Sequence, residues 1–262
     1  MNMPRWMKKF CIGIAVVALL LAGFYRFWMY PRYTVPILTY HYIDGNPWTL
    51  SVSPEIFERQ MKYLKDRNYN VISLDELVDG LRKGRDLPRN TVVITFDDGW
   101  EVLYDNAFPV LKKCKFPVTI FVITQWTDGK TFLNWNQIRE MAQYGIDFGS
   151  HMQKHSYIPD LKREQIVAEV AGSKDDLERE LGKPARHFCY PSGGFTEEAK
   201  EIVREAGYLS ASTTNRGTDR YNNDLYELMR VKVTNSDAVK PFHFWAKLSG
   251  YYNLFRGVKA GD

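Results

Sequence analysis

From residue 33 onward, the chain alternates short apolar runs with amphipathic segments. The apolar runs predict strands over residues 35–42, 71–74, 91–96, 118–124, 146–150, 186–190, 209–213 and 228–234. The segments between them predict helices that start at residue 53 and that cover residues 75–81, 102–113, 135–144, 162–181 and 197–206. The β-branched run Thr91–Phe96 is typical of a strand that is buried on both faces of a parallel sheet. The pattern therefore predicts an α/β fold.

The density of these units decides between two α/β architectures. Seven or eight strand–helix units in about 200 residues favour a distorted (β/α) barrel of about seven parallel strands over a doubly wound sheet. In such barrels the active site lies at the carboxyl ends of the strands. No internal repeat or low-complexity linker interrupts the pattern, so we expect one domain over residues 33–262.

A different pattern occupies residues 1–32. Residues 10–25 are uncharged and almost wholly apolar, and with the aromatic stretch up to Tyr30 they reach about 20 residues, enough to span a hydrocarbon core. Three basic residues and no acidic residue precede them, which keeps the N-terminus in the cytoplasm by the positive-inside rule. We therefore expect a cytoplasmic tip, a single-pass signal anchor in the cell membrane and an extracytoplasmic domain. A cleaved signal peptide is the alternative, although Ala22-Gly23-Phe24 is a poor cleavage site.

Composition supports a folded domain and argues against a nucleic-acid partner. The chain is 45% hydrophobic and 15% aromatic, which is sufficient for a sizeable core. Five of its 35 basic residues lie in residues 1–32, which leaves 30 against 31 acidic residues, so the net charge of +4 belongs to the N-terminus. No basic run marks a nucleic-acid surface. We expect a monomer.

The chain has three cysteines, and none of them forms a C-x-x-C pair. A disulfide between Cys114 and Cys189 is open to a protein outside the cytoplasm. Buried free thiols are the favoured interpretation.

Two groups of polar residues follow predicted strands. Asp97 and Asp98 come where the run Thr91–Phe96 stops, and two adjacent carboxylates are costly to bury without a cation or hydrogen bonds. His151 and His155 follow the strand that ends near residue 150, and on a helical turn their spacing puts both imidazoles on one side. Two histidines and an aspartate form a metal site with open positions for water and substrate. A solvated Asp-Asp-Gly turn and a chance histidine pair are the plainer interpretations.

Two further strand ends carry candidate groups. His41 ends the first predicted strand, where it is either a packed histidine or a general acid that faces the pocket. Residues 186–190 run into the turn Pro191-Ser192-Gly193-Gly194, whose backbone N–H groups can face a developing oxyanion.

Taken together, these motifs resemble the polysaccharide deacetylases of carbohydrate esterase family 4, which share the NodB-homology domain. Thr95–Gly99 (TFDDG) matches the first family motif, Ser150–His155 (SHMQKH) the second and Phe188–Gly193 (FCYPSG) the third, and the resemblance spans Val35–Val233. The resemblance implies a distorted (β/α) barrel, in agreement with the strand pattern.

The resemblance also implies roles for individual residues. Asp97 would be the general base, and Asp98, His151 and His155 would bind one divalent metal ion, with zinc favoured and cobalt or nickel as alternatives. The third motif would line the substrate groove with Tyr190 and Pro191, and the backbone N–H of Ser192 would face the oxyanion. We also expect Trp100 to contact the sugar.

Three departures from the family pattern affect these assignments. Cys189 stands where the family has an arginine that orients the base, and Arg230 is the candidate substitute. Ser192 replaces a tyrosine, although a backbone amide survives that change. No histidine follows Leu228 as the usual general acid.

The branch of the family with permuted motifs places the acid on the first strand. Tyr40-His41 resembles that arrangement, and His243 is the competing candidate. This branch includes deacetylases of the biofilm polymer poly-β-1,6-N-acetylglucosamine. The predicted function is therefore removal of acetyl groups from an N-acetylated polysaccharide. Peptidoglycan and chitooligosaccharides are alternative substrates, and another metallohydrolase or a catalytically silent glycan-binding wall protein is an alternative of a different class.

Overall fold

The computed structural model describes residues 4–214, 219–239 and 241–255. The chain divides into two compact units, Met1–Thr34 and Val35–Asp262. In the first unit, helix α1 (Arg5–Phe24) continues through a π-helical turn (Tyr25–Met29) and a 3-10 turn (Tyr30–Arg32). By length and composition alone, Arg5–Arg32 is apolar enough to cross a membrane, and it is one such helix among the described residues.

Aromatic and basic side chains pair along the last turns of this N-terminal helix. Phe24 stacks on Trp28 with ring centroids 5.0 Å apart. The guanidinium of Arg32 lies over the Trp28 ring and donates a hydrogen bond to the Trp28 carbonyl. Such amphipathic groups are enriched where helices meet the membrane–water interface.

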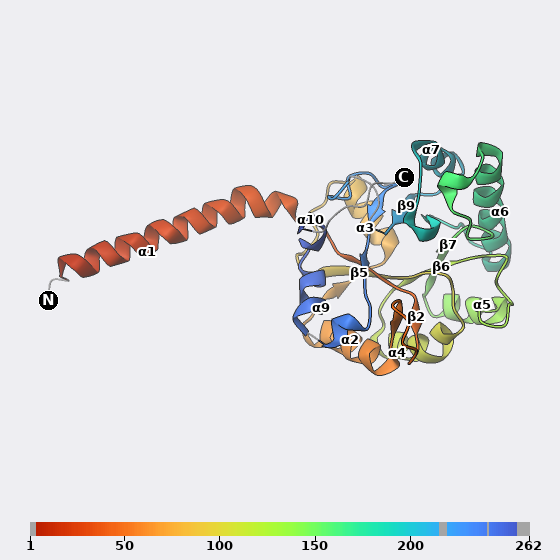
Figure 1. Cartoon of the computed structure of the whole chain (residues 1–262), viewed down its shortest axis with the longest axis horizontal. Coiled ribbons are helices and arrows are strands. Elements are labelled where there is room, and N and C mark those ends of the chain that lie inside the picture. The colour runs from red at the N-terminus through yellow and green to blue at the C-terminus, as the bar shows by residue number, and fades with distance from the viewer. Residues whose placement is uncertain (1–3, 215–218, 240, 256–262) are drawn as a thin grey trace. The chain divides into compact units, whose positions relative to one another are not determined.

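The second unit is a nearly closed barrel of parallel strands with helices around it, which confirms the predicted fold class (Figure 1). Its strands are β1 (Ile37–Tyr40), β4 (Asn70–Val71), β5 (Thr91–Phe96), β6 (Thr119–Val122), β7 (Asp147–Ser150), β8 (His187–Cys189), β9 (Ser210–Thr213), β10 (Leu228–Met229) and β11 (Val231–Lys232). Their spatial order is β10-β9-β8-β7-β6-β5-β1-β11, with β4 beside the first half of β5. Every strand pair among the described residues is parallel.

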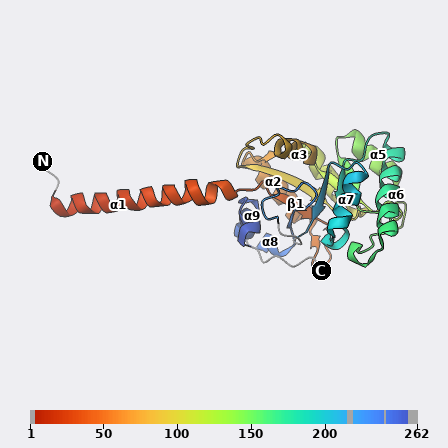
Figure 2. The same cartoon turned by 90° about the horizontal axis from the view of Figure 1, so that it is seen from above.

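The helices occupy the segments between the strands, and α5, α6 and α7 lie side by side on the outside of the barrel (Figure 2). Their bounds are α2 (Pro54–Asp66), α3 (Leu74–Arg82), α4 (Phe108–Cys114), α5 (Trp135–Gln143), α6 (Arg163–Leu181), α7 (Glu197–Glu205), α8 (Ser236–Val239), α9 (Pro241–Leu248) and α10 (Tyr252–Phe255). Side-chain caps begin four of them, because Ser53, Ser73, Asn134 and Thr196 each accept the N–H of the third helical residue.

The last predicted strand is in fact two short strands with different partners. β10 pairs with β9 and β11 pairs with β1, so the five residues Leu228–Lys232 join the two edges of the sheet. Arg230 lies at the change of partner, where its backbone N–H still reaches the Thr214 carbonyl at 3.3 Å. This segment makes the sheet a nearly closed ring.

Strand alternation sorts the buried side chains into an outer and an inner layer. On β5, Val92, Ile94 and Phe96 pack in one hydrophobic cluster, whereas Val93 packs in a second cluster, with residues of β6, β8 and β10 and of helix α3. Side chains two residues apart on a strand share a face. The inner face of β5 therefore continues from Val93 through Thr95 to Asp97.

Some elements escaped the sequence analysis. A two-stranded sheet forms between β2 (Tyr42–Ile43) and β3 (Ser51–Val52), and α8 to α10 follow the barrel. These elements are two to eight residues long, too short for a periodic pattern to stand out. Cys114 and Cys189 are free thiols, as favoured, but Cys189 is buried whereas Cys114 is partly exposed.

Candidate active site

Four residues of the candidate site lie directly after a barrel strand. His41 follows β1, Asp97 follows β5, His151 follows β7 and Tyr190 follows β8. The strand ladders extend by one hydrogen bond to hold them: the N–H of Asp97 donates to the Tyr40 carbonyl at 3.0 Å, and that of His151 donates to the Val122 carbonyl at 2.9 Å. The side chains therefore start from rigid backbone at one end of the barrel.

Asp97 forms a bidentate ion pair with Arg230 inside the barrel. The two guanidinium Nη atoms lie 2.6 and 2.7 Å from the two carboxylate oxygens, and both side chains are almost wholly buried. Burial alone would raise the pKa of Asp97, but the charge and hydrogen bonds of Arg230 outweigh burial and hold that pKa well below its usual range. Asp97 is therefore an ionised carboxylate.

Further contacts fix the guanidinium of Arg230 in place. Its Nε donates to the Thr213 carbonyl, and its two Nη atoms also donate to the Thr95 hydroxyl and the Cys189 sulfur, all at 3.0–3.1 Å. The guanidinium carbon lies 5.4 Å from the centre of the Phe121 ring. The arginine beside Asp97 is thus Arg230, which lies between β10 and β11 and not in the third motif.

Asp98, His151 and His155 gather on the other side of Asp97. Oδ1 of Asp98 lies 3.4 Å from Nε2 of His151 and 3.5 Å from Nε2 of His155, and the two imidazole rings are 4.8 Å apart at their centres. One ligand atom from each residue lies within 4.8 Å of the others, which suits a single metal ion. Nδ1 of His151 lies 2.8 Å from the Cys189 carbonyl, and a hydrogen bond donated by Nδ1–H to that carbonyl directs Nε2 toward Asp98 and His155.

The donor set fits a divalent transition metal. Two imidazole nitrogens and one carboxylate oxygen converge from three residues, and that composition is common in zinc sites that keep open positions for water or substrate. Burial and the neighbouring His151 lower the pKa of His155, which favours its neutral, metal-binding form. The pKa of His151 is shifted the other way: burial would lower it, but Cys189 and the hydrogen bond to Asp98 outweigh burial and raise it, so metal binding at His151 would displace a proton.

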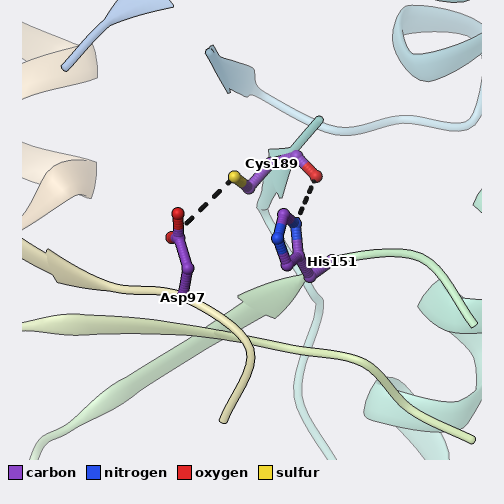
Figure 3. A group of neighbouring side chains, drawn as sticks. All are labelled: Asp97, His151 and Cys189. Atoms are coloured by element: carbon purple, nitrogen blue, oxygen red, sulfur yellow. Dashed lines mark hydrogen bonds between the residues drawn. The ribbon is translucent and has the colours of Figure 1, made fainter. Parts of the chain in front are cut away.

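A second group of potential ligands is less suitable. Asp97, His151 and Cys189 also lie close together (Figure 3). However, both oxygens of Asp97 already accept hydrogen bonds from Arg230, which also donates to the Cys189 sulfur. A cation placed among these three residues would meet that guanidinium, so Asp98, His151 and His155 form the better site.

Unusual backbone conformations accompany the candidate ligands. Asp98 and His155 adopt positive φ angles of 71° and 58°, which non-glycine residues rarely do. Gly99 also has a positive φ, and a Cβ there would come within 2.8 Å of Val122. The tight turn after β5 therefore needs glycine at this position.

The two histidines do not lie on a helical turn, the geometry in which their spacing would put both imidazoles on one side. Residues 151–157 form an irregular loop in which Met152 has a φ of 65°. Glu169 of α6 holds this loop, because one of its carboxylate oxygens accepts the N–H groups of Gln153 and Lys154 at 3.0 and 2.9 Å. The two imidazoles thus meet through a loop that is fixed by a helix.

His41 faces Asp97 across the same cavity. Its Nε2 lies 3.8 Å from Oδ2 of Asp97, and burial lowers its pKa against the opposing effect of Asp97 and Asp98. His243, the competing candidate for the acid, is exposed on α9.

These residues share one cavity of about 300 Å³ at the carboxyl ends of the strands. Tyr190 and Ser192 of the third motif also line it, while Pro191 is buried in the turn beneath. The turn closes through hydrogen bonds from Gly193 N–H to the Tyr190 carbonyl and from Gly194 N–H to the Pro191 carbonyl. Neither of these bonds uses the N–H of Ser192. The Ser192 backbone has a positive φ of 53°.

Comparison with known proteins agrees with this site. The family model described as polysaccharide deacetylase matches residues 84–211. YxkH of Bacillus subtilis, which is assigned to the polysaccharide deacetylases, is 35% identical over 201 residues that cover 76% of this chain and 71% of YxkH. This chain belongs to the polysaccharide deacetylase family.

A relative with a named substrate and two solved structures are also similar to this deacetylase. The poly-β-1,6-N-acetyl-D-glucosamine N-deacetylase of Staphylococcus epidermidis is 31% identical over 199 residues, covering 71% of this chain and 68% of the relative. Among solved structures, the Streptococcus pyogenes deacetylase PplD in complex with acetate and IcaB from Ammonifex degensii superpose with TM-scores of 0.75 and 0.73. Both are 28% identical and cover 82% of this chain and 97% of their own.

Sequence reasoning missed several residues of the deacetylase site. Leu50, Thr214 and Lys232 line the cavity, and Glu169 braces the histidine loop. Thr214 directly follows β9, so a strand-end search would have found it. Nothing in the sequence distinguishes Glu169 from the other acidic residues of α6.

The buried pair between Asp97 and Arg230 gives a stability prediction. Arg230→Met leaves a buried carboxylate without its partner, so we expect the free energy of unfolding to fall by about 3–5 kcal/mol. The measurement is urea unfolding in the presence of a chelator, so that metal binding does not contribute.

A double-mutant cycle tests the pairing itself. Asp97→Asn combined with Arg230→Met should cost less than the sum of the single changes, by about 1 kcal/mol or more. Arg163→Met, which breaks an exposed pair with Glu198, is the matched control and should change stability little. Additive losses at Asp97 and Arg230 would contradict the pairing.

Proposed function

We propose that this polysaccharide deacetylase is a metal-dependent, extracytoplasmic enzyme that hydrolyses the acetamide groups of N-acetylglucosamine units and releases acetate and free amino sugar. One observation carries the proposal. An ionised carboxylate, a three-residue metal-binding cluster and a buried histidine face a single cavity of about 300 Å³.

The metal-binding residues of the proposal are Asp98, His151 and His155. A divalent ion bound by them, with zinc favoured and cobalt or nickel as alternatives, supplies Lewis acidity toward the acetamide carbonyl and lowers the pKa of a bound water. The converging Nε2 and Oδ1 atoms support this assignment.

Asp97 is the proposed general base. Arg230 holds both of its oxygens by hydrogen bonds along one edge of the carboxylate, which orients the group and keeps it ionised. Such a carboxylate accepts the proton of the attacking water. Arg230 is therefore proposed to position the base, the role that the third-motif arginine has in the family.

His41 is the proposed general acid. It lines the same cavity as the metal-binding cluster, and its Nε2 lies 3.8 Å from Oδ2 of Asp97. As the carbon–nitrogen bond breaks, His41 would donate a proton to the leaving amine; burial disfavours its protonated form, and the neighbouring carboxylates of Asp97 and Asp98 favour that form.

The backbone N–H of Ser192 is proposed to stabilise the tetrahedral oxyanion, and Tyr190, which lines the cavity, is the proposed contact to sugar. Pro191 is buried and the Trp100 ring is stacked against Tyr42 and Phe132, so the sugar contacts expected of these two residues are not proposed.

The proposed substrate is a polymer like poly-β-1,6-N-acetylglucosamine. The named activity of the staphylococcal relative supports this choice. The protein is proposed to act as a monomer.

Acetate release tests the activity and the substrate together. Purified full-length protein should release acetate from β-1,6-linked N-acetylglucosamine oligomers faster than from chitooligosaccharides or peptidoglycan fragments. Asp97→Asn should lower kcat by about 10²–10⁴-fold. Chelation should abolish activity, and added Zn²⁺ or Co²⁺ should restore it. Binding of these glycans without acetate release would instead indicate a silent glycan-binding protein.

A comparison of two histidines tests the general acid. His41→Ala should lower kcat by about 10²–10⁴-fold, because the leaving amine loses its proton donor. His243→Ala, at an exposed position on α9, is the control and should retain activity. The reverse result would move the acid to His243.

The N-terminal helix is proposed to be an uncleaved single-pass anchor. Its length and apolar composition support this assignment. The full chain should sediment with membranes and resist extraction by alkaline carbonate, whereas the chain without residues 1–32 should be soluble. Added protease should digest the barrel in spheroplasts. A mature protein that begins after residue 25 would point to a cleaved signal peptide.

A further inference from the structure

Trp100 lies between two aromatic rings at the edge of the active site. Its indole stacks against Tyr42 with ring centroids 4.4 Å apart and against Phe132 with centroids 4.3 Å apart, both at an interplanar angle of 27°. The backbone is pinned as well, because Trp100 and Phe132 form an antiparallel bridge and the N–H of Leu133 donates to the Gly99 carbonyl at 2.8 Å. The indole therefore has little freedom to rotate.

The edge of this fixed ring points at a candidate metal ligand. Nε1 of Trp100 donates a hydrogen bond to Oδ2 of Asp98 at 2.9 Å. The other oxygen, Oδ1, is the one that faces Nε2 of His151 and Nε2 of His155. The two carboxylate oxygens are thus divided, with one held by the indole and one turned to the metal-binding position.

We infer that Trp100 is a positioning residue for Asp98: its indole N–H fixes the rotation of the carboxylate so that Oδ1 is presented to the metal. This inference rests on the proposed metal site. Partners that hold a ligand from behind in this way commonly change metal affinity by 10–100-fold when they are removed. The carbonyl of Cys189 has the equivalent relation to His151, since it holds Nδ1 while Nε2 faces the metal.

The stacked setting also explains why a tryptophan suits this position. Tyr42 and Phe132 pack against the apolar ring of Trp100 and leave its N–H edge available as a hydrogen-bond donor. The Asp98 side chain is mostly buried, so its Oδ2 has limited access to water. An unpaired carboxylate oxygen at such a site is costly. The indole N–H removes that cost in one orientation of the carboxylate and so selects it.

Metal affinity measured with Zn²⁺ alone separates this role from simple packing. Trp100→Phe keeps an aromatic ring between Tyr42 and Phe132 but lacks the N–H donor, and we expect the dissociation constant for Zn²⁺ to rise by about 10–100-fold. The full-length proteins are titrated against a chromophoric chelator. Trp48→Phe makes the same change at a residue that contacts Tyr42, and it should leave the affinity unchanged.

A second variant guards against a loss of folding in Trp100→Phe. Trp100→Gln retains a side-chain N–H donor but discards the ring. The order of affinity expected is wild type, then Trp100→Gln, then Trp100→Phe. Urea unfolding of each chelated protein, repeated with Zn²⁺, gives the metal-induced gain in stability within each variant, so any intrinsic loss of stability cancels.

The outcomes distinguish a failure of the proposed metal site from a failure of the positioning role of Trp100. If the wild-type protein binds neither Zn²⁺ nor Co²⁺, the proposed metal site fails and this inference fails with it. If the wild type binds Zn²⁺ and Trp100→Phe binds it equally well, or binds it at least as well as Trp100→Gln does, the inference alone is overturned. A weaker Trp100→Phe with an unchanged Trp48→Phe supports the inference.

Discussion

The ion pair between Asp97 and Arg230 links the closure of the barrel to its chemistry. Arg230 lies between β10, which pairs with β9, and β11, which pairs with β1. The residue at the closure of the ring of strands therefore also holds the carboxylate of Asp97 at the end of β5. A buried charge pair is costly unless its hydrogen bonds are complete. Here the guanidinium is satisfied by Asp97, Thr95, Thr213 and Cys189, so closure of the ring and orientation of the carboxylate require the same geometry.

Around this pair, the site is held in place mainly by groups behind the residues that face the cavity. The Cys189 carbonyl holds His151, Glu169 holds the loop before His155, and Trp100 holds Asp98. These partners come from a strand, a helix and a loop, so the cluster depends on the whole barrel. The positive φ angles at Asp98 and His155 are sustained by these contacts.

The sequence predicts the strands and the strand-end residues well, because an apolar run that stops at a polar residue is a local signal. Asp97, Asp98 and His151 are found in this way. The partner of Asp97 is a long-range contact: Arg230 is 133 residues away, and strand pairing brings it near. The spacing of His151 and His155 suits a helical turn, but spacing alone does not reveal the positive φ of Met152 that makes this segment an irregular loop. The division of residues 228–232 between two neighbours likewise depends on the closed sheet.

The switch of partner at Arg230 has a consequence for the order of residues along the chain. His41, near the start of the barrel, and Arg230, near its end, are separated by 189 residues, but His41 directly follows β1 and Arg230 directly precedes β11, and these two strands pair. In a closed ring of parallel strands, the first and last strands are neighbours like any other two. A side chain at the end of the first strand can therefore reach the same cavity as a side chain at the end of the last strand. The position of a group such as His41 in the cavity does not depend on where along the sequence its strand occurs.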